Sequence, residues 1–156
     1  MTPNDFLSPD APLSLLTHSG GPFSGLRSAA GCVCGILLYH GRDGEAHEAA
    51  QALSTPDGAF WHGIVHRREP DPGNAAYWFR RVGRHPVFPT LRAAVREVEA
   101  QFPGCRLGMG ADWDPIVWID FWESARRDTD SSQWRMATEI ERVEWRVLFD
   151  YCSEPL

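Results

Sequence analysis

Residues 60–86 read FWHGIVHRREPDPGNAAYWFRRVGRHP, and this stretch predicts two helices packed against each other. The first helix must end before Pro70, because the residue that precedes a proline is pushed out of the helical region. Asp71 and Pro72 then provide a capping carboxylate followed by proline at the first helical position. Gly83 favours the left-handed conformation that stops the second helix. Since only a short turn separates the two helices, we expect them to form an antiparallel pair.

The chain on either side of this pair also shows helical periodicity. Leu91, Val95, Val98 and Phe102 are spaced by four, three and four residues, which places them on one face of a helix. The predicted helices cover residues 27–39, 43–53, 57–69, 72–82, 91–102, 115–126 and 132–151. We therefore expect an all-α, single-domain bundle of about six or seven helices. A stack of repeated helical pairs is the alternative architecture.

Two segments near the N-terminus have their own patterns. Residues 1–27 are rich in Pro, Ser and Gly and predict an irregular N-terminal arm, followed by a helical domain over 28–156. Residues 31–39, GCVCGILLY, are a short apolar run, which fits a buried strand as well as a helix.

The segment 85–89, HPVFP, predicts a turn before the helix that carries Leu91.

The composition indicates a folded, acidic domain. The chain has 156 residues, of which 43% are hydrophobic and seven are Trp, which is incompatible with a disordered chain. The formal net charge is -6, so we expect no general affinity for nucleic acid or acidic membranes. All fifteen basic side chains are arginine, whose planar guanidinium suits carboxylates and phosphates.

The cysteines and the N-terminal residues favour a cytoplasmic location. Residues 1–10 lack the basic and then apolar pattern of a signal peptide, and residues 31–39 are too short to cross a bilayer. We therefore expect a cytoplasmic protein with free thiols. No zinc-ribbon or CxxC spacing connects the four cysteines, which are Cys32, Cys34, Cys105 and Cys152.

Histidines and a carboxylate share one face of the helix predicted over 57–69. His62, His66 and Glu69 lie at i, i+4 and i+7, and imidazole and carboxylate are ligands that zinc and iron accept. Gly63 follows the first histidine, so this is not the zinc-protease motif, which needs glutamate there. His47 could complete a three-histidine site if the helix over 43–53 packs alongside. A hydrogen-bonded structural pair of histidines is the competing interpretation.

The segment 62–85 also carries a local positive charge. Its five arginines outnumber Glu69 and Asp71 and give it a net charge of +3, which leaves -9 on the remainder of the chain. Arginines beside imidazoles suit an anionic small molecule. Pairing of these arginines with acidic helices elsewhere is the alternative. The side chains that we expect to bind such a ligand are Arg67, Asn74, Tyr77, Arg80, Arg81 and His85.

Several strings in this region resemble a known group of proteins. They are FWHGIVHRRE at 60–69, NAAYWFRRVG at 74–83 and HPVF at 85–88, with further likeness at 38–40, 45–47, 144–145 and 148–152. Together they resemble a family of small, uncharacterised bacterial and fungal proteins. The resemblance implies a shared helical domain and no particular reaction.

Three functional hypotheses follow from these residues. The first is a pocket that binds an anionic small molecule or a divalent metal such as zinc or iron. In a hydrolytic version His62 or His66 is the general base, and Arg80 or Arg81 holds an anion. The second is a helical interaction module that docks an acidic partner. The third is a buried hydrogen-bonded network that serves only to stabilise the fold.

Overall fold

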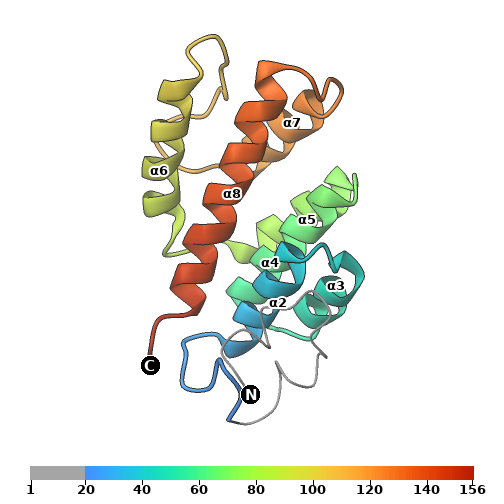
Figure 1. Ribbon diagram of the computed structural model, residues 1–156, viewed down its shortest axis with the longest axis vertical. Helices are drawn as coiled ribbons and strands as arrows, with labels where there is room; N and C mark the ends of the chain where they lie inside the picture. The colour runs from blue at the N-terminus through green and yellow to red at the C-terminus, as the bar shows by residue number, and fades with distance from the viewer. Residues whose placement is uncertain (1–19) are drawn as a thin grey trace.

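The computed structural model describes residues 20–156, which form seven α-helices and no β-sheet (Figure 1). The prediction of an all-α bundle of six or seven helices is confirmed. Residues 20–28 form turns, and the earlier part of the predicted N-terminal arm lies outside the described residues. The helices are α2 (Ala29–Tyr39), α3 (Asp43–Gln51), α4 (Pro56–Arg68), α5 (Pro72–Val82), α6 (Phe88–Gln101), α7 (Pro115–Ala125) and α8 (Ser132–Cys152).

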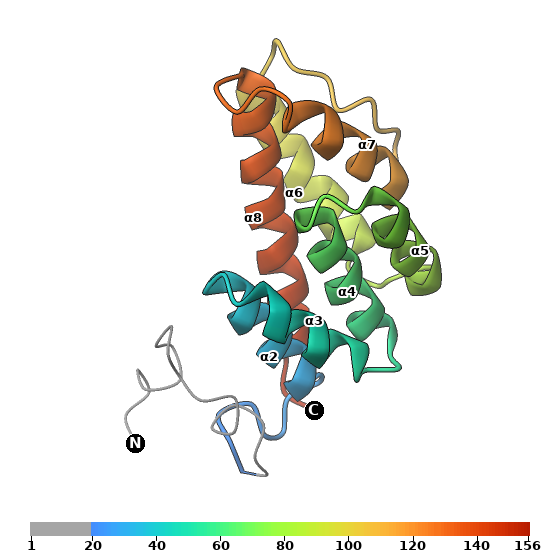
Figure 2. The same ribbon diagram turned by 90° about the vertical axis from the view of Figure 1, so that its right-hand side faces the viewer.

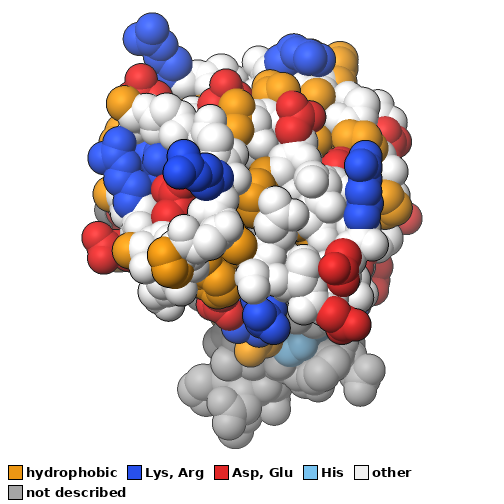
Figure 3. Space-filling view, turned by 90° about the horizontal axis from the view of Figure 1, so that it is seen from above, with side chains coloured by type: hydrophobic (Ala, Val, Ile, Leu, Met, Phe, Trp, Pro, Cys, Tyr) orange, Lys and Arg blue, Asp and Glu red, His pale blue; other side chains and the backbone are white. Residues whose placement is uncertain are grey.

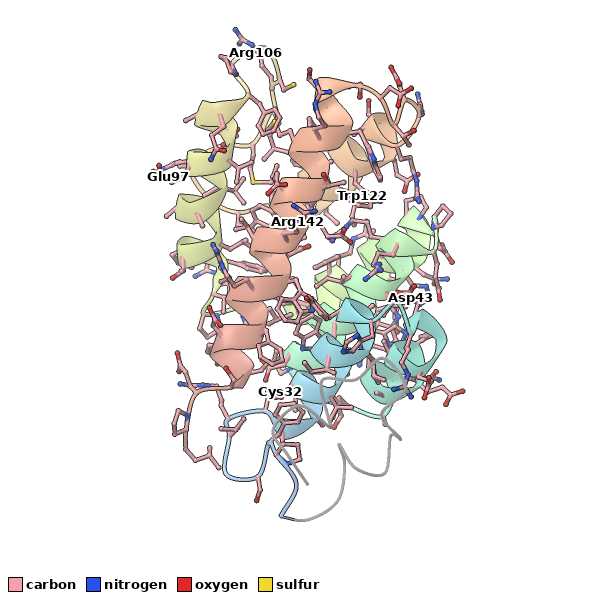
Figure 4. All side chains as sticks on the ribbon, in the orientation of Figure 1. Cys32, Asp43, Glu97, Arg106, Trp122 and Arg142 are labelled. Carbon is pink, nitrogen blue, oxygen red and sulfur yellow. The ribbon has the colours of Figure 1, made fainter. Side chains whose placement is uncertain are left out.

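The 21-residue helix α8 runs through the middle of the bundle and packs against α2, α6 and α7 (Figures 1 and 2). On its inner face every fourth residue is completely buried, because a four-residue step stays on one side of a helix. That stripe consists of Met136, Ile140, Glu144, Leu148 and Cys152. Trp122 lies between α7 and α8, where its ring is 4.9 Å from the ring of Trp134 (Figure 4).

The apolar run over 31–39 is a helix and not a strand. Helix α2 is covered by α3, α4 and α8, so its residues are buried on nearly all sides. Gly35 permits this packing, since a Cβ there would lie 2.7 Å from the ring of Phe149 and 3.1 Å from that of Trp61. Cys32 on this helix is buried (Figure 4), and all four cysteines are free thiols, as expected.

The capping residues found in the sequence begin the helices as predicted. The carboxylate of Asp71 accepts a hydrogen bond from the backbone N–H of Asn74 at 3.1 Å, and α5 follows it. The carboxylate of Asp114 accepts from the N–H of Ile116 at 2.8 Å and begins α7 in the same way. Gly83 has a φ of 64° and follows the last residue of α5.

Other helix boundaries differ from the prediction. Helix α4 begins one residue before Asp57, because the Thr55 side chain accepts a hydrogen bond from the N–H of Gly58 and caps it. Helix α6 begins at Phe88, so the predicted turn over 85–89 is wrong in its last two residues. Pro89 fits inside the first turn of that helix, where its missing N–H would have no partner in any case.

Helices α4 and α5 form the antiparallel pair that the Pro-Asp-Pro turn predicts, and they pack along their lengths. Phe60 and Phe79 pack edge to face, with their ring centres 5.4 Å apart. Gly63 allows the close approach, because a Cβ there would lie 2.7 Å from the Phe79 ring. The pairing therefore depends on a small residue of α4 facing an aromatic residue of α5.

A buried ion pair connects α4 to α8. The guanidinium of Arg67 donates two hydrogen bonds to the carboxylate of Glu144, at 3.1 and 2.5 Å, and both side chains are fully buried. The indole N–H of Trp118 on α7 donates to the same carboxylate at 3.3 Å. The guanidinium also lies over the rings of Trp118 and Trp122, at 5.0 and 5.4 Å. Three helices thus meet at one charged contact.

The outside of the bundle is polar and mixed in charge. Figure 3 shows arginine and acidic side chains scattered among hydrophobic atoms on one end of the molecule. Glu97 and Arg106 project outward from α6 and from the loop that follows it (Figure 4). Within residues 20–156, no helix combines the length and the apolar character that a bilayer crossing requires.

We predict that Glu144→Gln destabilises the protein by about 3–5 kcal/mol, because it leaves the Arg67 charge buried without its counter-charge. The double replacement Arg67→Met with Glu144→Leu should restore most of that loss, since it removes both charges. Urea unfolding followed by circular dichroism measures these differences. The control is Glu139→Gln, which removes an exposed ion pair with Arg142 and should cost less than about 1 kcal/mol. Equal losses in Glu144→Gln and the control would contradict this account.

Candidate metal centre

Helices α3 and α4 bring three histidines together. His62 and His66 lie one turn apart on α4, so both project from the same face of that helix. His47 projects from α3, which packs against α4 after a short connection. The sequence-based expectation that His47 lies beside the other two agrees with this placement.

The three imidazole rings are in mutual contact. Each residue offers one ring nitrogen, and these three atoms all lie within 4.8 Å of one another. The rings of His62 and His66 are stacked, with centres 4.9 Å apart and planes 12° apart. The His47 ring stands nearly perpendicular to both, at centre distances of 4.6 and 4.9 Å. We call His47, His62 and His66 the histidine triad.

Carboxylates stand at the solvent side of the histidine triad. Glu69, directly after α4, places its oxygens 3.2 Å from Nδ1 of His66 and 4.0 Å from Nδ1 of His47. Asp71 places an oxygen 4.0 Å from Nδ1 of His66. The side chains of His47 and Glu69 are 33% and 37% exposed, so this side of the triad is open to water.

The inner side of the triad is buried against an aromatic ring. His62 is 2% exposed, and its ring stacks on Trp78 of α5 at 3.9 Å. Both of its ring nitrogens are buried and have no hydrogen-bond partner within residues 20–156. Nδ1 of His66 is also buried and makes no well-aligned hydrogen bond, although Glu69 is close. Buried nitrogens of this kind normally have a partner.

Burial keeps the inner histidines neutral. Removal from water, together with the neighbouring His47 and His66, lowers the pKa of His62 to about 4. Burial also lowers the pKa of His66, against the opposing effect of the Glu69 carboxylate. Neutral imidazole is the form that binds a metal ion. The triad therefore presents two buried, neutral imidazoles, with the His47 ring and a carboxylate beside them.

Arg67 lies away from the triad. It occupies the position next to His66, and successive residues of a helix point in directions about 100° apart. Its guanidinium donates hydrogen bonds to both carboxylate oxygens of Glu144. The sequence carries a signal for that contact, since Glu144 stands on the otherwise apolar stripe of α8 and such a carboxylate needs a buried partner.

The predicted ligand-binding residues of α5 lie on its exposed face, and the structure does not bring them into the triad. The Asn74 amide donates to Asp71 at 2.6 Å. The Arg81 guanidinium lies over the rings of Tyr77 and Trp78, at 5.7 and 5.4 Å. Trp78 is the residue of this helix that contacts the triad. Arg80 is exposed on the same helix.

His85 is part of a separate contact. It is buried, and its Nε2 lies 2.8 Å from an oxygen of Asp57 in the first turn of α4. Its Nδ1 accepts a hydrogen bond from the N–H of Val87 at 3.3 Å. Both ring nitrogens are therefore satisfied, and His85 fixes the segment before α6 onto α4. Asp57 gave no sign of this role in the sequence, because its partner is 28 residues away.

We predict that acid weakens the metal-free protein through His62. The unfolded chain binds a proton at this residue below about pH 6.5, whereas the folded chain resists protonation until about pH 4. Stability therefore falls as the pH drops through that interval. Between pH 7 and 4.5 the loss due to His62 should be about 2 kcal/mol.

Urea unfolding at the two pH values tests this prediction. His62→Phe keeps a ring against Trp78 but cannot be protonated, so this variant should lose about 2 kcal/mol less than the parent protein. His62→Leu serves as a second variant in case the larger ring does not fit. An identical pH-dependent loss in the parent and in both variants would show that His62 is not the residue responsible.

Comparison of the chain with models of known protein families, with curated proteins and with solved structures returned no match.

Proposed function

We propose that this protein binds a divalent transition-metal ion, with zinc the best fit, through His47, His62 and His66. The observation that carries the proposal is His62, whose two ring nitrogens are buried without a partner beside two further imidazoles. Leaving a buried polar group unsatisfied costs roughly 1–3 kcal/mol. A metal ion bound to one of these nitrogens offsets that cost.

The spacing of the donors supports a tetrahedral ion. Zinc binds imidazole nitrogen at about 2.0–2.1 Å, so three nitrogens already within 4.8 Å of one another need only small side-chain rotations to reach one ion. Two of the donors are one turn apart on a single helix, and the third comes from the packed neighbour. Iron(II) accepts the same imidazole and carboxylate donors and is the alternative metal.

A purely structural network explains the same residues less well. Such a network is stabilising when its members satisfy one another, and partly satisfied networks are costly. The Asp57–His85 contact shows the satisfied arrangement in this very protein, with a partner for each ring nitrogen. In the histidine triad, by contrast, both ring nitrogens of His62 and Nδ1 of His66 lack a hydrogen-bond partner among the described residues.

The open side of the triad supports hydrolytic chemistry as the function of the bound ion. Catalytic zinc sites commonly have three protein ligands and keep the fourth position for water, whose pKa the ion lowers to about 7. Glu69 stands on this side, either as the fourth ligand or as the base that accepts a proton from that water.

We predict that each chain binds one zinc ion. The protein is purified without a histidine tag and stripped of metal with a chelator, and zinc binding is then titrated in competition with a chromophoric chelator. His47→Ala, His62→Ala and His66→Ala should each weaken binding by at least about 100-fold, because each removes a ligand. Zinc should raise the Tm of the parent protein and leave that of the triad variants almost unchanged.

The matched control is His40→Ala, which removes a histidine outside the triad and should retain the parent affinity for zinc. Circular dichroism of each metal-free variant separates loss of a ligand from loss of the fold. Binding that is as strong in the three triad variants as in the parent protein would rule out this site, as would a parent protein that binds no zinc, iron or manganese.

A further inference from the structure

A second site is independent of the histidine triad. A hollow of about 830 Å³ lies between the end of α5, the first half of α6 and the segment 111–115 that leads into α7. Figure 2 shows α5 and α7 on one side of α8, with α6 behind them. The volume is in the range of small-molecule pockets. We call it the α5–α7 hollow, and none of the triad residues lines it.

Two arginines at this hollow have no carboxylate partner. Arg84 is exposed and follows the end of α5. Within residues 20–156, no acidic side chain lies within ion-pair distance of Arg84 or of Arg96 on α6. The guanidinium of Arg96 donates to the backbone oxygen of Ala111 at 3.1 Å, which holds it against the rim. The other lining arginine, Arg92, is neutralised by Glu99 at 2.6 Å.

Two acidic residues, Asp112 and Asp114, also line the hollow. The Asp114 carboxylate accepts hydrogen bonds from the first N–H groups of α7, whose positive helix end stabilises it. Asp112 is exposed on the rim and is the acidic lining residue without such a contact. Because Asp112 and Asp114 together balance the formal charge of Arg84 and Arg96, the attraction for an anion depends on the position of the two guanidinium groups and not on a net positive charge of the lining.

The walls of the hollow are apolar and aromatic. Phe88 and Trp113 line it, and Trp113 is 6% exposed. The indole N–H of Trp113 is fully buried and has no acceptor among the described residues. The hollow therefore combines aromatic side chains with charged ones, which together can contact the apolar body and the charged group of a small organic ion.

We propose that the α5–α7 hollow binds a small organic anion, with Arg84 and Arg96 holding the anionic group and Phe88 and Trp113 contacting its apolar body. The proposal does not depend on metal binding. Guanidinium groups suit carboxylate, sulfonate and phosphate groups alike because each can accept paired hydrogen bonds.

The probe for the test is 8-anilinonaphthalene-1-sulfonate, an organic anion that fluoresces in apolar surroundings, and N-phenyl-1-naphthylamine is its uncharged counterpart. We expect the anion to bind saturably, one per chain, and more tightly than the neutral compound. The double variant Arg84→Gln with Arg96→Gln should raise the Kd of the anion by at least about tenfold, while Asp112→Asn lowers it about twofold.

The matched control is Arg142→Gln with Arg146→Gln, which removes two arginines from a separate hollow between α2, α4 and α8. It should leave the Kd of the anion unchanged. Arg84→Gln alone removes an exposed side chain that makes no hydrogen bond or ion pair with residues 20–156, so it tests the site without risk to the fold. The proposal is overturned if the control variant loses binding while the Arg84 and Arg96 variants retain it, or if the neutral compound binds as tightly as the anion.

Discussion

The buried ion pair between Arg67 and Glu144 fixes how α4 is rotated in the bundle. Both side chains are completely buried, and the pair is tied further by the indole of Trp118. A buried ion pair adds little net stability relative to apolar residues, but breaking it is costly, so it strongly disfavours any other rotation of the helix. Because Arg67 must face α8, the adjacent histidines of α4 must face elsewhere.

That rotation turns His62 and His66 toward α3 and α5. There they meet His47 on the open side and the Trp78 ring on the closed side. The indole excludes water from His62, which lowers its pKa and keeps it neutral, whereas Glu69 remains at the solvent side. A cluster of imidazoles, two of which burial keeps neutral, with a carboxylate at its opening suits a cation and offers it nitrogen donors. The histidine triad is thus a consequence of packing on two faces of one short helix.

The sequence predicts those parts of the structure that depend on neighbouring residues. The α4–α5 pair follows from proline, a capping aspartate and a glycine stop, and the grouping of His62, His66 and Glu69 follows from helical spacing. Contacts between distant residues could not be predicted in this way. The sequence predicts that Arg67 and His85 bind a ligand. In the structure Arg67 contacts Glu144, 77 residues away, and His85 contacts Asp57. Helical periodicity places a residue on a face, but it does not identify the helix that this face meets.

X-ray absorption at the zinc K-edge of the zinc-loaded protein tests the metal centre most directly. The proposed site predicts three nitrogen donors at about 2.0–2.1 Å that show the outer-shell scattering of imidazole rings, together with one oxygen donor. His62→Ala should reduce the imidazole contribution by one ring. A spectrum with oxygen donors alone, or one that His62→Ala leaves unchanged, would contradict a metal centre formed by His47, His62 and His66.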